Sequence, residues 1–194
     1  KIAYLRLKQF NAKSPKEMSL SINKLEKKQP FGYVLDLRSN PGGLLEASIE
    51  ISRQWINNGI IVSTKTNDGI TDVRRSMGRA LTDRPVVVLI DEGSASASEI
   101  LSGAIKDNNR GILVGKKTFG KGLVQSMRTL VDGSGLTVTV AKYLTPNGTD
   151  INKSGIVPDI EVKMNINPIL QRDIGTRKDT TCSIGSVTMF FNIN

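Results

Sequence analysis

Residues 85–125 constrain the fold more than any other part of the chain. Residues 85–90, PVVVLI, form a short apolar run rich in β-branched side chains, which is typical of a strand buried on both faces of a sheet. The apolar side chains of residues 100–105 then recur with the spacing of one helix face. A strand that passes directly into a helix predicts an α/β unit, with its turn at residues 94–98, SASAS.

This turn carries a candidate nucleophile, Ser96. A small-residue turn from strand to helix directs a hydroxyl group outward at a helix N-terminus, where unpaired N–H groups and the helix dipole favour negative charge. Ser96 and Glu99 also fit the capping box S-x-x-E, in which the serine only caps the helix. The residue available as a base decides between these two roles.

Lysine is the remaining candidate for that base. The chain has no histidine, which excludes a Ser-His-Asp triad. Residues 112–114 predict a second short strand, followed by GKKTFGKG, in which Lys121 lies between glycines that let the backbone approach a site closely. Gln125 follows in a predicted strand at 123–129, on the same face as Lys121. Because only a neutral lysine accepts a proton, Lys121 is expected to be desolvated.

A third stretch, residues 33–43, predicts a site for a developing anion. The strand YVLDL breaks into RSNPGG before a helix at about residues 44–58, and glycines at a helix start expose consecutive N–H groups. An isolated NPGG would be a tight turn, but the serine turn favours the anion-binding role. Asp36 and Arg38 are predicted to form an ion pair that supports the site.

The motifs LDLRSNPGGLL, SASASEI and GKKTFGKGLVQ, in this order, resemble those of the carboxyl-terminal processing (tail-specific) peptidases, which are serine enzymes with a Ser-Lys dyad. The resemblance covers residues 1 to about 162. It implies the following roles: Ser96 as nucleophile, Lys121 as general base, Gln125 as the group that orients the lysine, the amides of Gly42 and Ala97 as oxyanion hole, and Asp36, Arg38 and Glu99 as supporting residues.

The sequence pattern alone predicts only an α/β fold. The resemblance implies a mixed sheet with covering helices, a crotonase-like core, for residues 1–162. Residues 163–194 depart from the family pattern and are predicted to be an atypical, poorly ordered tail. No segment resembles the PDZ domain with which the family captures substrate C-termini, so the isolated chain is expected to have weak activity.

Two longer stretches are most similar to plastid and cyanobacterial members of the family: DLRSNPGGLLEASIEISRQW and ALTDRPVVVLIDEGSASASEI. The substrate of these members is the precursor of a photosystem II reaction-centre protein, trimmed at its C-terminus in the thylakoid lumen. The resemblance therefore implies a protein or peptide substrate bound through its C-terminal region, in the chloroplast thylakoid lumen. The alternatives are a bacterial periplasm or a cyanobacterial lumen, and the targeting segment is expected outside this chain.

Two other functions compete with a peptidase. Residues 115–121 satisfy the P-loop pattern G-x-x-x-x-G-K, but Gly122 takes the place of the metal-binding Ser or Thr, and a strand follows where a phosphate-binding helix is required. A non-catalytic ligand-binding module, as in the family's retinoid-binding relatives, would keep the architecture without needing Ser96 and Lys121.

Composition argues against other partners. The net charge of +9 raises nucleic acid as a partner, but the 27 Lys and Arg residues are spread along the chain, and its 5 Phe and 3 Tyr residues do not interleave with basic stretches. A single cysteine, Cys182, excludes an internal disulfide, and the lack of histidine disfavours zinc. No cofactor, metal, nucleic acid or transmembrane segment is predicted, and the oligomeric state stays open.

Overall fold

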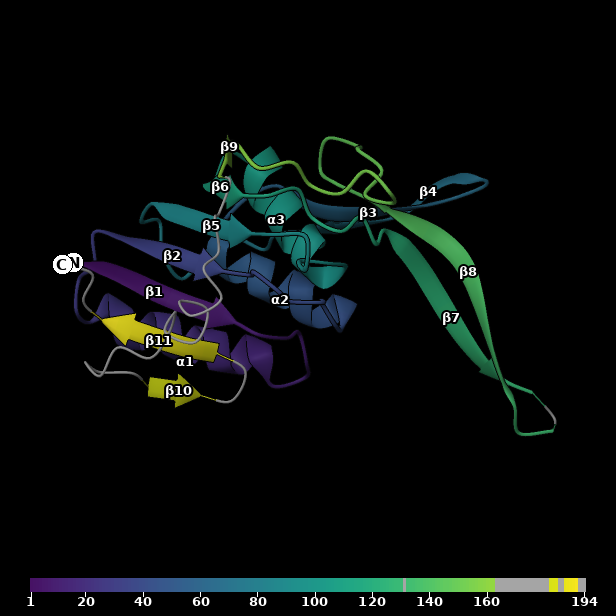
Figure 1. Cartoon of the computed structure of the whole chain (residues 1–194), viewed down its shortest axis with the longest axis horizontal. Helices are drawn as coiled ribbons and strands as arrows, with labels where there is room; N and C mark the ends of the chain where they lie inside the picture. Colours follow the sequence, from purple (N-terminus) through teal and green to yellow (C-terminus); the bar gives the residue numbers. More distant parts are fainter. Residues whose placement is uncertain (131, 163–181, 185–186, 192–194) are drawn as a thin grey trace.

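The computed structural model describes residues 1–130, 132–162, 182–184 and 187–191, which form the elements drawn in Figure 1. In chain order these are β1 (Ile2–Leu7), α1 (Ser14–Glu26), β2 (Gly32–Asp36), α2 (Leu45–Trp55), β3 (Ile60–Thr66), β4 (Gly69–Arg75), β5 (Val86–Ile90), α3 (Ala97–Asp107), β6 (Ile112–Gly115), β7 (Leu123–Thr129), β8 (Gly135–Leu144), β9 (Ile160–Glu161), β10 (Cys182–Ile184) and β11 (Val187–Phe191).

The strands form two sheets. The first has the order β10-β11-β1-β2-β5-β6-β9, in which β1, β2, β5, β6 and β9 run parallel and β11 pairs antiparallel with β1. The second has the order β4-β3-β8-β7 and is antiparallel. The predicted mixed α/β architecture is therefore confirmed.

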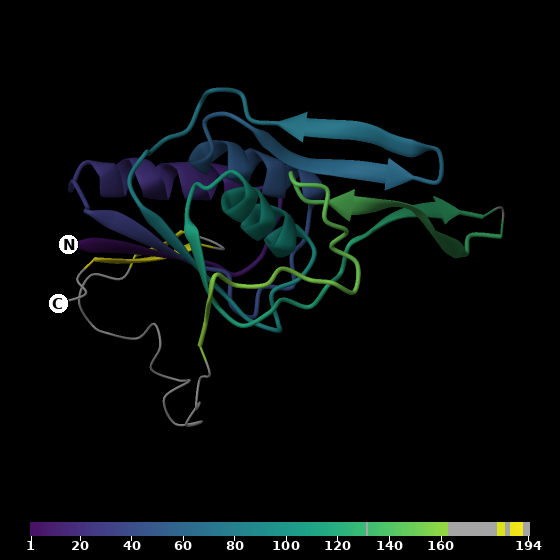
Figure 2. The same ribbon diagram turned by 90° about the horizontal axis from the view of Figure 1, so that it is seen from above.

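The core lies between the first sheet and the helices, which cover one of its faces (Figure 2). Alternate residues of the parallel strands point into this core, so Leu5, Leu35 and Val88 are fully buried. Trp55, at the end of α2, meets Tyr33 edge to face at a centroid distance of 5.2 Å. This packing fixes the strands whose ends carry the candidate site.

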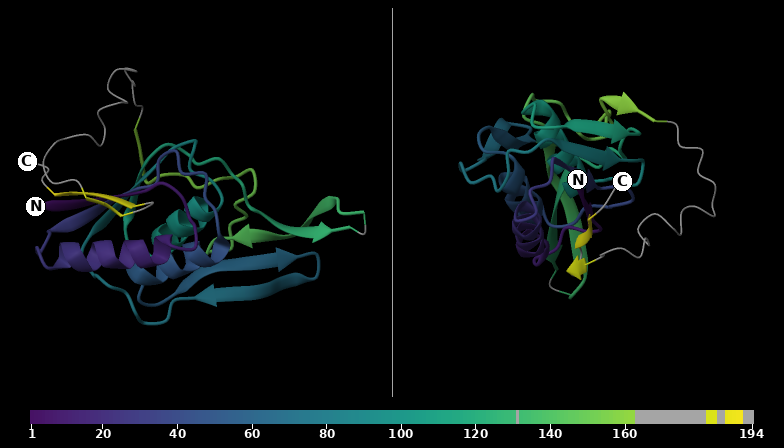
Figure 3. Two further views of the ribbon diagram at one scale, coloured as in Figure 1. Left: turned by 90° about the horizontal axis from the view of Figure 1, so that it is seen from below. Right: turned by 90° about the vertical axis from the view of Figure 1, so that its left-hand side faces the viewer.

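The β3–β4 and β7–β8 hairpins project from the same end of the molecule (Figure 3). The first of them turns at Asn67 and Asp68, as its sequence predicts. In β8 the residues before Ala141 are exposed, whereas Tyr143 and Leu144 at its base are buried against the core. The base of this hairpin therefore anchors β7, which directly follows Lys121.

Strands β10 and β11 lie within residues 163–194, the predicted poorly ordered tail, and join the first sheet beside β1. The rest of that tail lies outside the described residues, so the division of the chain at residue 162 stays a prediction. Among the helices that the structure describes, none has both the length and the apolar character needed to cross a membrane.

Candidate active site

Two turns meet at one edge of the first sheet: the glycine turn, residues 38–43, and the serine turn, residues 94–98. Strands β2 and β5 are parallel neighbours, so their C-terminal ends bring these turns together. The Asn40 carbonyl accepts hydrogen bonds from Ala95 N–H at 3.0 Å and from Ser98 Oγ at 2.9 Å. The Ser94 hydroxyl donates to the Leu37 carbonyl at 2.8 Å.

Ser96 is the N-cap residue of α3 and has the backbone angles φ 56° and ψ −113°. N-cap residues ordinarily adopt the β region, whereas a non-glycine residue at such a positive φ is strained by about 1–3 kcal/mol. The predicted capping box with Glu99 is also formed. Because capping alone does not require this strain, the backbone of Ser96 favours a second role for its hydroxyl group.

Glu99 joins the serine turn to the lysine loop, residues 116–122. Its side chain is fully buried. Its Oε2 atom accepts the N–H groups of Ser96 and Lys121, both at 2.8 Å. Its Oε1 atom accepts the Thr118 hydroxyl at 2.5 Å and Gly120 N–H at 2.6 Å. One carboxylate therefore fixes the backbone of both candidate dyad residues.

The lysine loop also packs against residues 151–156. Lys153 N–H donates to the Gly120 carbonyl at 2.8 Å, and a β-carbon on Gly122 would lie 2.3 Å from the Asn152 nitrogen. The side chain of Lys121 is exposed, so the desolvation expected from the sequence is not present in this structure.

Gln125 is also exposed. A register shift between Val124 and Gln125 interrupts the pairing of β7 with β8. The pairing skips Val140, so the extra residue lies on β8 and the alternation along β7 is not interrupted; the placement of Gln125 beside Lys121 stays a prediction.

Gly42 brings the glycine turn into direct contact with the serine turn. Its φ is +95°, and a β-carbon there would lie 2.8 Å from the Ala97 nitrogen and 2.9 Å from Ser96 Cβ. The two predicted oxyanion-hole residues are therefore neighbours. Gly42 N–H donates to Asn40 Oδ1 at 2.9 Å in this structure, a contact for which the only sequence signal was the turn-forming character of asparagine.

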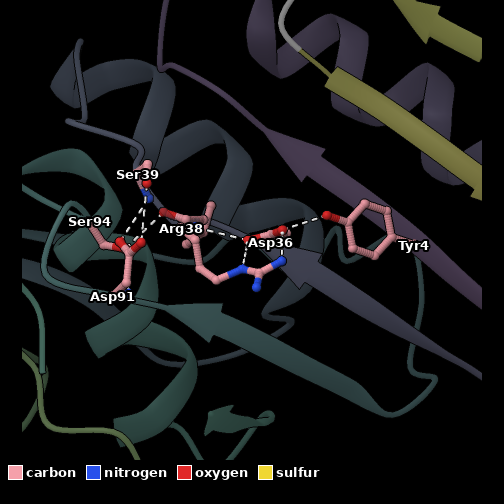
Figure 4. Close-up of polar contacts among 7 residues, drawn as sticks. Tyr4, Asp36, Arg38, Ser39, Asp91 and Ser94 are labelled. Atoms are coloured by element: carbon pink, nitrogen blue, oxygen red, sulfur yellow. Dashed lines mark hydrogen bonds and ion pairs between the residues drawn. The ribbon is translucent and has the colours of Figure 1, made fainter. Parts of the chain in front are cut away.

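The predicted ion pair of Asp36 and Arg38 is present (Figure 4). Arg38 donates to Asp36 through Nε at 2.9 Å and through Nη2 at 2.6 Å, and the Tyr4 hydroxyl donates to the same carboxylate at 2.5 Å. Burial alone would raise the pKa of Asp36, but the hydrogen bonds from Arg38 and Tyr4 outweigh it and lower that pKa. Burial, followed by the charge of Asp36, raises the pKa of Tyr4, which therefore stays a donor.

Asp91 forms hydrogen bonds with residues of both the glycine turn and the serine turn (Figure 4). Its Oδ1 atom accepts Ser39 N–H at 2.7 Å, and its own N–H donates to Ser94 Oγ at 3.0 Å. Sequence reasoning missed Asp91 and Tyr4, because the contacts of Asp91 with Ser39 and of Tyr4 with Asp36 join distant parts of the chain. Within the described part of the chain, no group of three or more His, Cys, Asp or Glu side chains is placed to hold a metal ion.

Comparison with known proteins identifies a family for most of the chain. The model of peptidase family S41 matches residues 1–162. A carboxyl-terminal-processing protease of Picosynechococcus sp. is 55% identical over 159 residues, which are 82% of this chain and 38% of that protein. The chloroplastic C-terminal processing peptidase of Tetradesmus obliquus is 42% identical over 168 residues, which are 86% of this chain and 36% of that protein.

Among solved structures, a photosystem II D1 C-terminal processing protease superposes with a TM-score of 0.81 at 42% identity, covering 84% of this chain and 42% of that chain. This chain thus spans less than half the length of each of these relatives. The match of the family model to most of the chain, together with the identity to these relatives, shows that the chain belongs to peptidase family S41.

Proposed function

We propose that this chain is the catalytic core of a serine endopeptidase with a Ser96–Lys121 dyad, which cleaves protein substrates near their C-terminus. The observation that carries the proposal is the buried carboxylate of Glu99, which accepts the backbone N–H groups of both residues. A capping glutamate needs only the N-cap amide. Its further bonds to the lysine loop serve to hold that loop beside the serine turn.

The proposed reaction follows from these positions. Neutral Lys121 takes the proton of the Ser96 hydroxyl, and Oγ attacks the carbonyl carbon of the scissile bond. The oxyanion lies against the amides of Gly42 and Ala97. The leaving amine receives the proton from Lys121, which becomes neutral again. The Lys121 amine then takes a proton from a water molecule, and this water hydrolyses the acyl-enzyme. Gln125 is proposed to orient the Lys121 amine.

Lys121 is exposed to solvent, and its amine therefore needs to lose water before it can act as a base. Loss of water favours the neutral form of a lysine. A substrate that lies across the serine turn and the lysine loop would remove water from the amine at the moment it is needed. We therefore propose that substrate binding completes the dyad.

The relatives suggest a substrate and a location. Cyanobacterial and chloroplastic processing peptidases match this chain, and one solved relative is named for the D1 protein of photosystem II. We propose the precursor of this reaction-centre protein as the substrate, bound through its C-terminal region in the thylakoid lumen.

The test is hydrolysis of a peptide that spans a C-terminal processing site. Ser96→Ala is expected to lower kcat by roughly 10⁴-fold or more. The control is Ser102→Ala, which removes another α3 hydroxyl, one that donates to the Ser98 carbonyl, and it should retain activity. If Ser96→Ala hydrolyses the peptide as fast as wild type, Ser96 is not the nucleophile and the proposal is wrong. If wild type does not hydrolyse the peptide at all, the chain is a non-catalytic module and the proposal is also wrong.

The lysine is tested in the same assay. Lys121→Arg is expected to be inactive, because a guanidinium group keeps its proton. Lys117→Arg is the matched control, since Lys117 is an exposed lysine of the same loop. Full activity of Lys121→Arg would exclude Lys121 as the base.

A further inference from the structure

We infer that Asn40 is a positioning residue, which aligns the amide of Gly42 with the serine turn so that both can bind the oxyanion. The inference rests on the proposed function. It concerns a residue that the sequence motifs did not assign to the site, and it follows from a set of buried contacts that converge on this one side chain and its carbonyl.

The carboxamide of Asn40 is fully buried and has a defined orientation. Nδ2 donates to the Leu7 carbonyl at 2.7 Å, and Oδ1 accepts Gly42 N–H at 2.9 Å. Leu7 O can only accept and Gly42 N–H can only donate, so a flipped carboxamide would lose both bonds. Asn40 thereby fixes Gly42 relative to the end of β1.

The carbonyl of the same residue holds the other half of the site. It accepts Ala95 N–H and the Ser98 hydroxyl, which belong to residues on either side of Ser96. Asn40 is therefore bonded both to the donor of the glycine turn and to the turn that carries the nucleophile. A change in its position would change the distance between the Gly42 and Ala97 amides.

The bond from Gly42 to Asn40 Oδ1 does not prevent oxyanion binding. Hydrogen bonds to a charged acceptor are roughly twice as strong as those between neutral groups. An oxyanion can therefore share Gly42 N–H with the neutral carboxamide in a three-centre hydrogen bond, while the amide stays where Asn40 holds it. The donor is held in place at rest and is used as charge develops in the transition state.

Asn40→Ala removes this alignment, and the variant is tested with two ligands. A peptidyl boronic acid bonds to Ser96 Oγ, whose proton passes to the base, and forms a tetrahedral anion at the oxyanion site. A peptide amide of the same sequence binds without forming an anion. We expect kcat and boronate affinity to fall about 10- to 100-fold, because loss of a whole oxyanion donor costs about 10²–10³-fold, with KM and peptide-amide affinity changed less than about 3-fold.

Asn40→Asp provides a second variant of nearly the same shape in case the alanine variant does not fold. It keeps an acceptor for Gly42 N–H, loses the donor to the Leu7 carbonyl and places a negative charge beside the oxyanion, so boronate affinity should fall more than peptide-amide affinity. Asn108→Ala is the control, because it also removes a side chain that donates to backbone carbonyls, those of Ile60 and Ala104, at the other end of α3.

The outcomes separate this inference from the proposed function. If Ser96→Ala is inactive but the Asn40 variants keep wild-type kcat and boronate affinity, the role of Asn40 is wrong and the dyad stands. If boronate and peptide-amide affinities fall together in these variants, Asn40 is only structural and the inference is also wrong. If Ser96→Ala is as active as wild type, the proposed function itself fails.

Discussion

Ser96 and Lys121 donate their backbone N–H groups to the same atom, Glu99 Oε2, each at 2.8 Å. The two amide nitrogens therefore lie no further apart than twice this distance. Because Glu99 is buried and also bonds Thr118 and Gly120, the lysine loop cannot move away from the serine turn without breaking several buried hydrogen bonds. The backbone of the candidate dyad is thus fixed even though the Lys121 side chain is exposed.

Glu99→Gln is predicted to lower both stability and activity. All four partners of this carboxylate are donors, so the NH₂ group of glutamine would face donors and leave buried groups unpaired, at about 1–3 kcal/mol each. Chemical denaturation should show the loss of unfolding free energy, and kcat/KM should fall at least about 10²-fold.

Glu92→Gln is the control for this prediction. Glu92 is an exposed glutamate paired with Lys116, and surface ion pairs contribute little, so both quantities should stay close to wild type. Equal behaviour of the two variants would contradict the bridging role of Glu99.

Gly42→Ala is predicted to abolish most activity, and Gly69→Ala is its matched control. Both glycines have positive φ, +95° and +121°, so an added methyl group strains both backbones by about 1 kcal/mol. A β-carbon on Gly42 would meet the Ala95 carbonyl at 2.5 Å and Ser96 Cβ at 2.9 Å, whereas one on Gly69 meets nothing within 4 Å. The kcat of Gly42→Ala should therefore be much lower than that of Gly69→Ala, although the backbone strain of the two variants is similar. Similar kcat values would show that the two turns need not be in contact.

The parts of the site that sequence predicted well depend on short separations along the chain. Ser96 and Glu99 are three residues apart on one helix start, and their capping box is present. The Asn67-Asp68-Gly69 turn also predicted its hairpin, because the turn signal lies within three consecutive residues. Asp36 and Arg38 are two residues apart at the end of β2, so their ion pair could be predicted without knowledge of the rest of the fold.

The parts that sequence missed depend on which distant segments become neighbours. Tyr4 reaches Asp36 because β1 and β2 are parallel neighbours, and nothing in either strand alone indicates this pair. The contacts of Asn40 with Leu7 and Ser98 likewise require the folded sheet. The exposure of Lys121 is a tertiary feature too, so a local pattern did not predict it.

Acid is predicted to destabilise the chain through Asp36. Its pKa is lowered in the folded state, because the bonds from Arg38 and Tyr4 outweigh the effect of burial. A group with a lowered folded-state pKa contributes stability above its unfolded pKa of about 4, and loses that contribution as pH falls towards the folded value. Unfolding free energy should therefore decrease as pH falls below about 4.

Asp36→Asn tests this assignment, because asparagine cannot titrate. The variant should be less stable than wild type at neutral pH, and the difference should shrink as the pH is lowered below about 4. A difference that stays constant from pH 7 to pH 3 would show that Asp36 does not contribute through its charge.

Gly122→Ala is predicted to displace the lysine loop. A β-carbon there would lie 2.3 Å from the Asn152 nitrogen and 2.8 Å from the Ile151 carbonyl carbon. Both are backbone atoms, so a change of side-chain rotamer cannot relieve the clash. Relief requires movement of residues 151–152, and Lys153 N–H would then lose its bond to the Gly120 carbonyl. Gly135→Ala is the matched control, since nothing lies within 4 Å of its β-carbon, and such a change costs less than about 0.5 kcal/mol. We expect Gly122→Ala to lower kcat/KM at least about tenfold and Gly135→Ala to leave it unchanged; equal values for both would mean that residues 151–156 do not position Lys121.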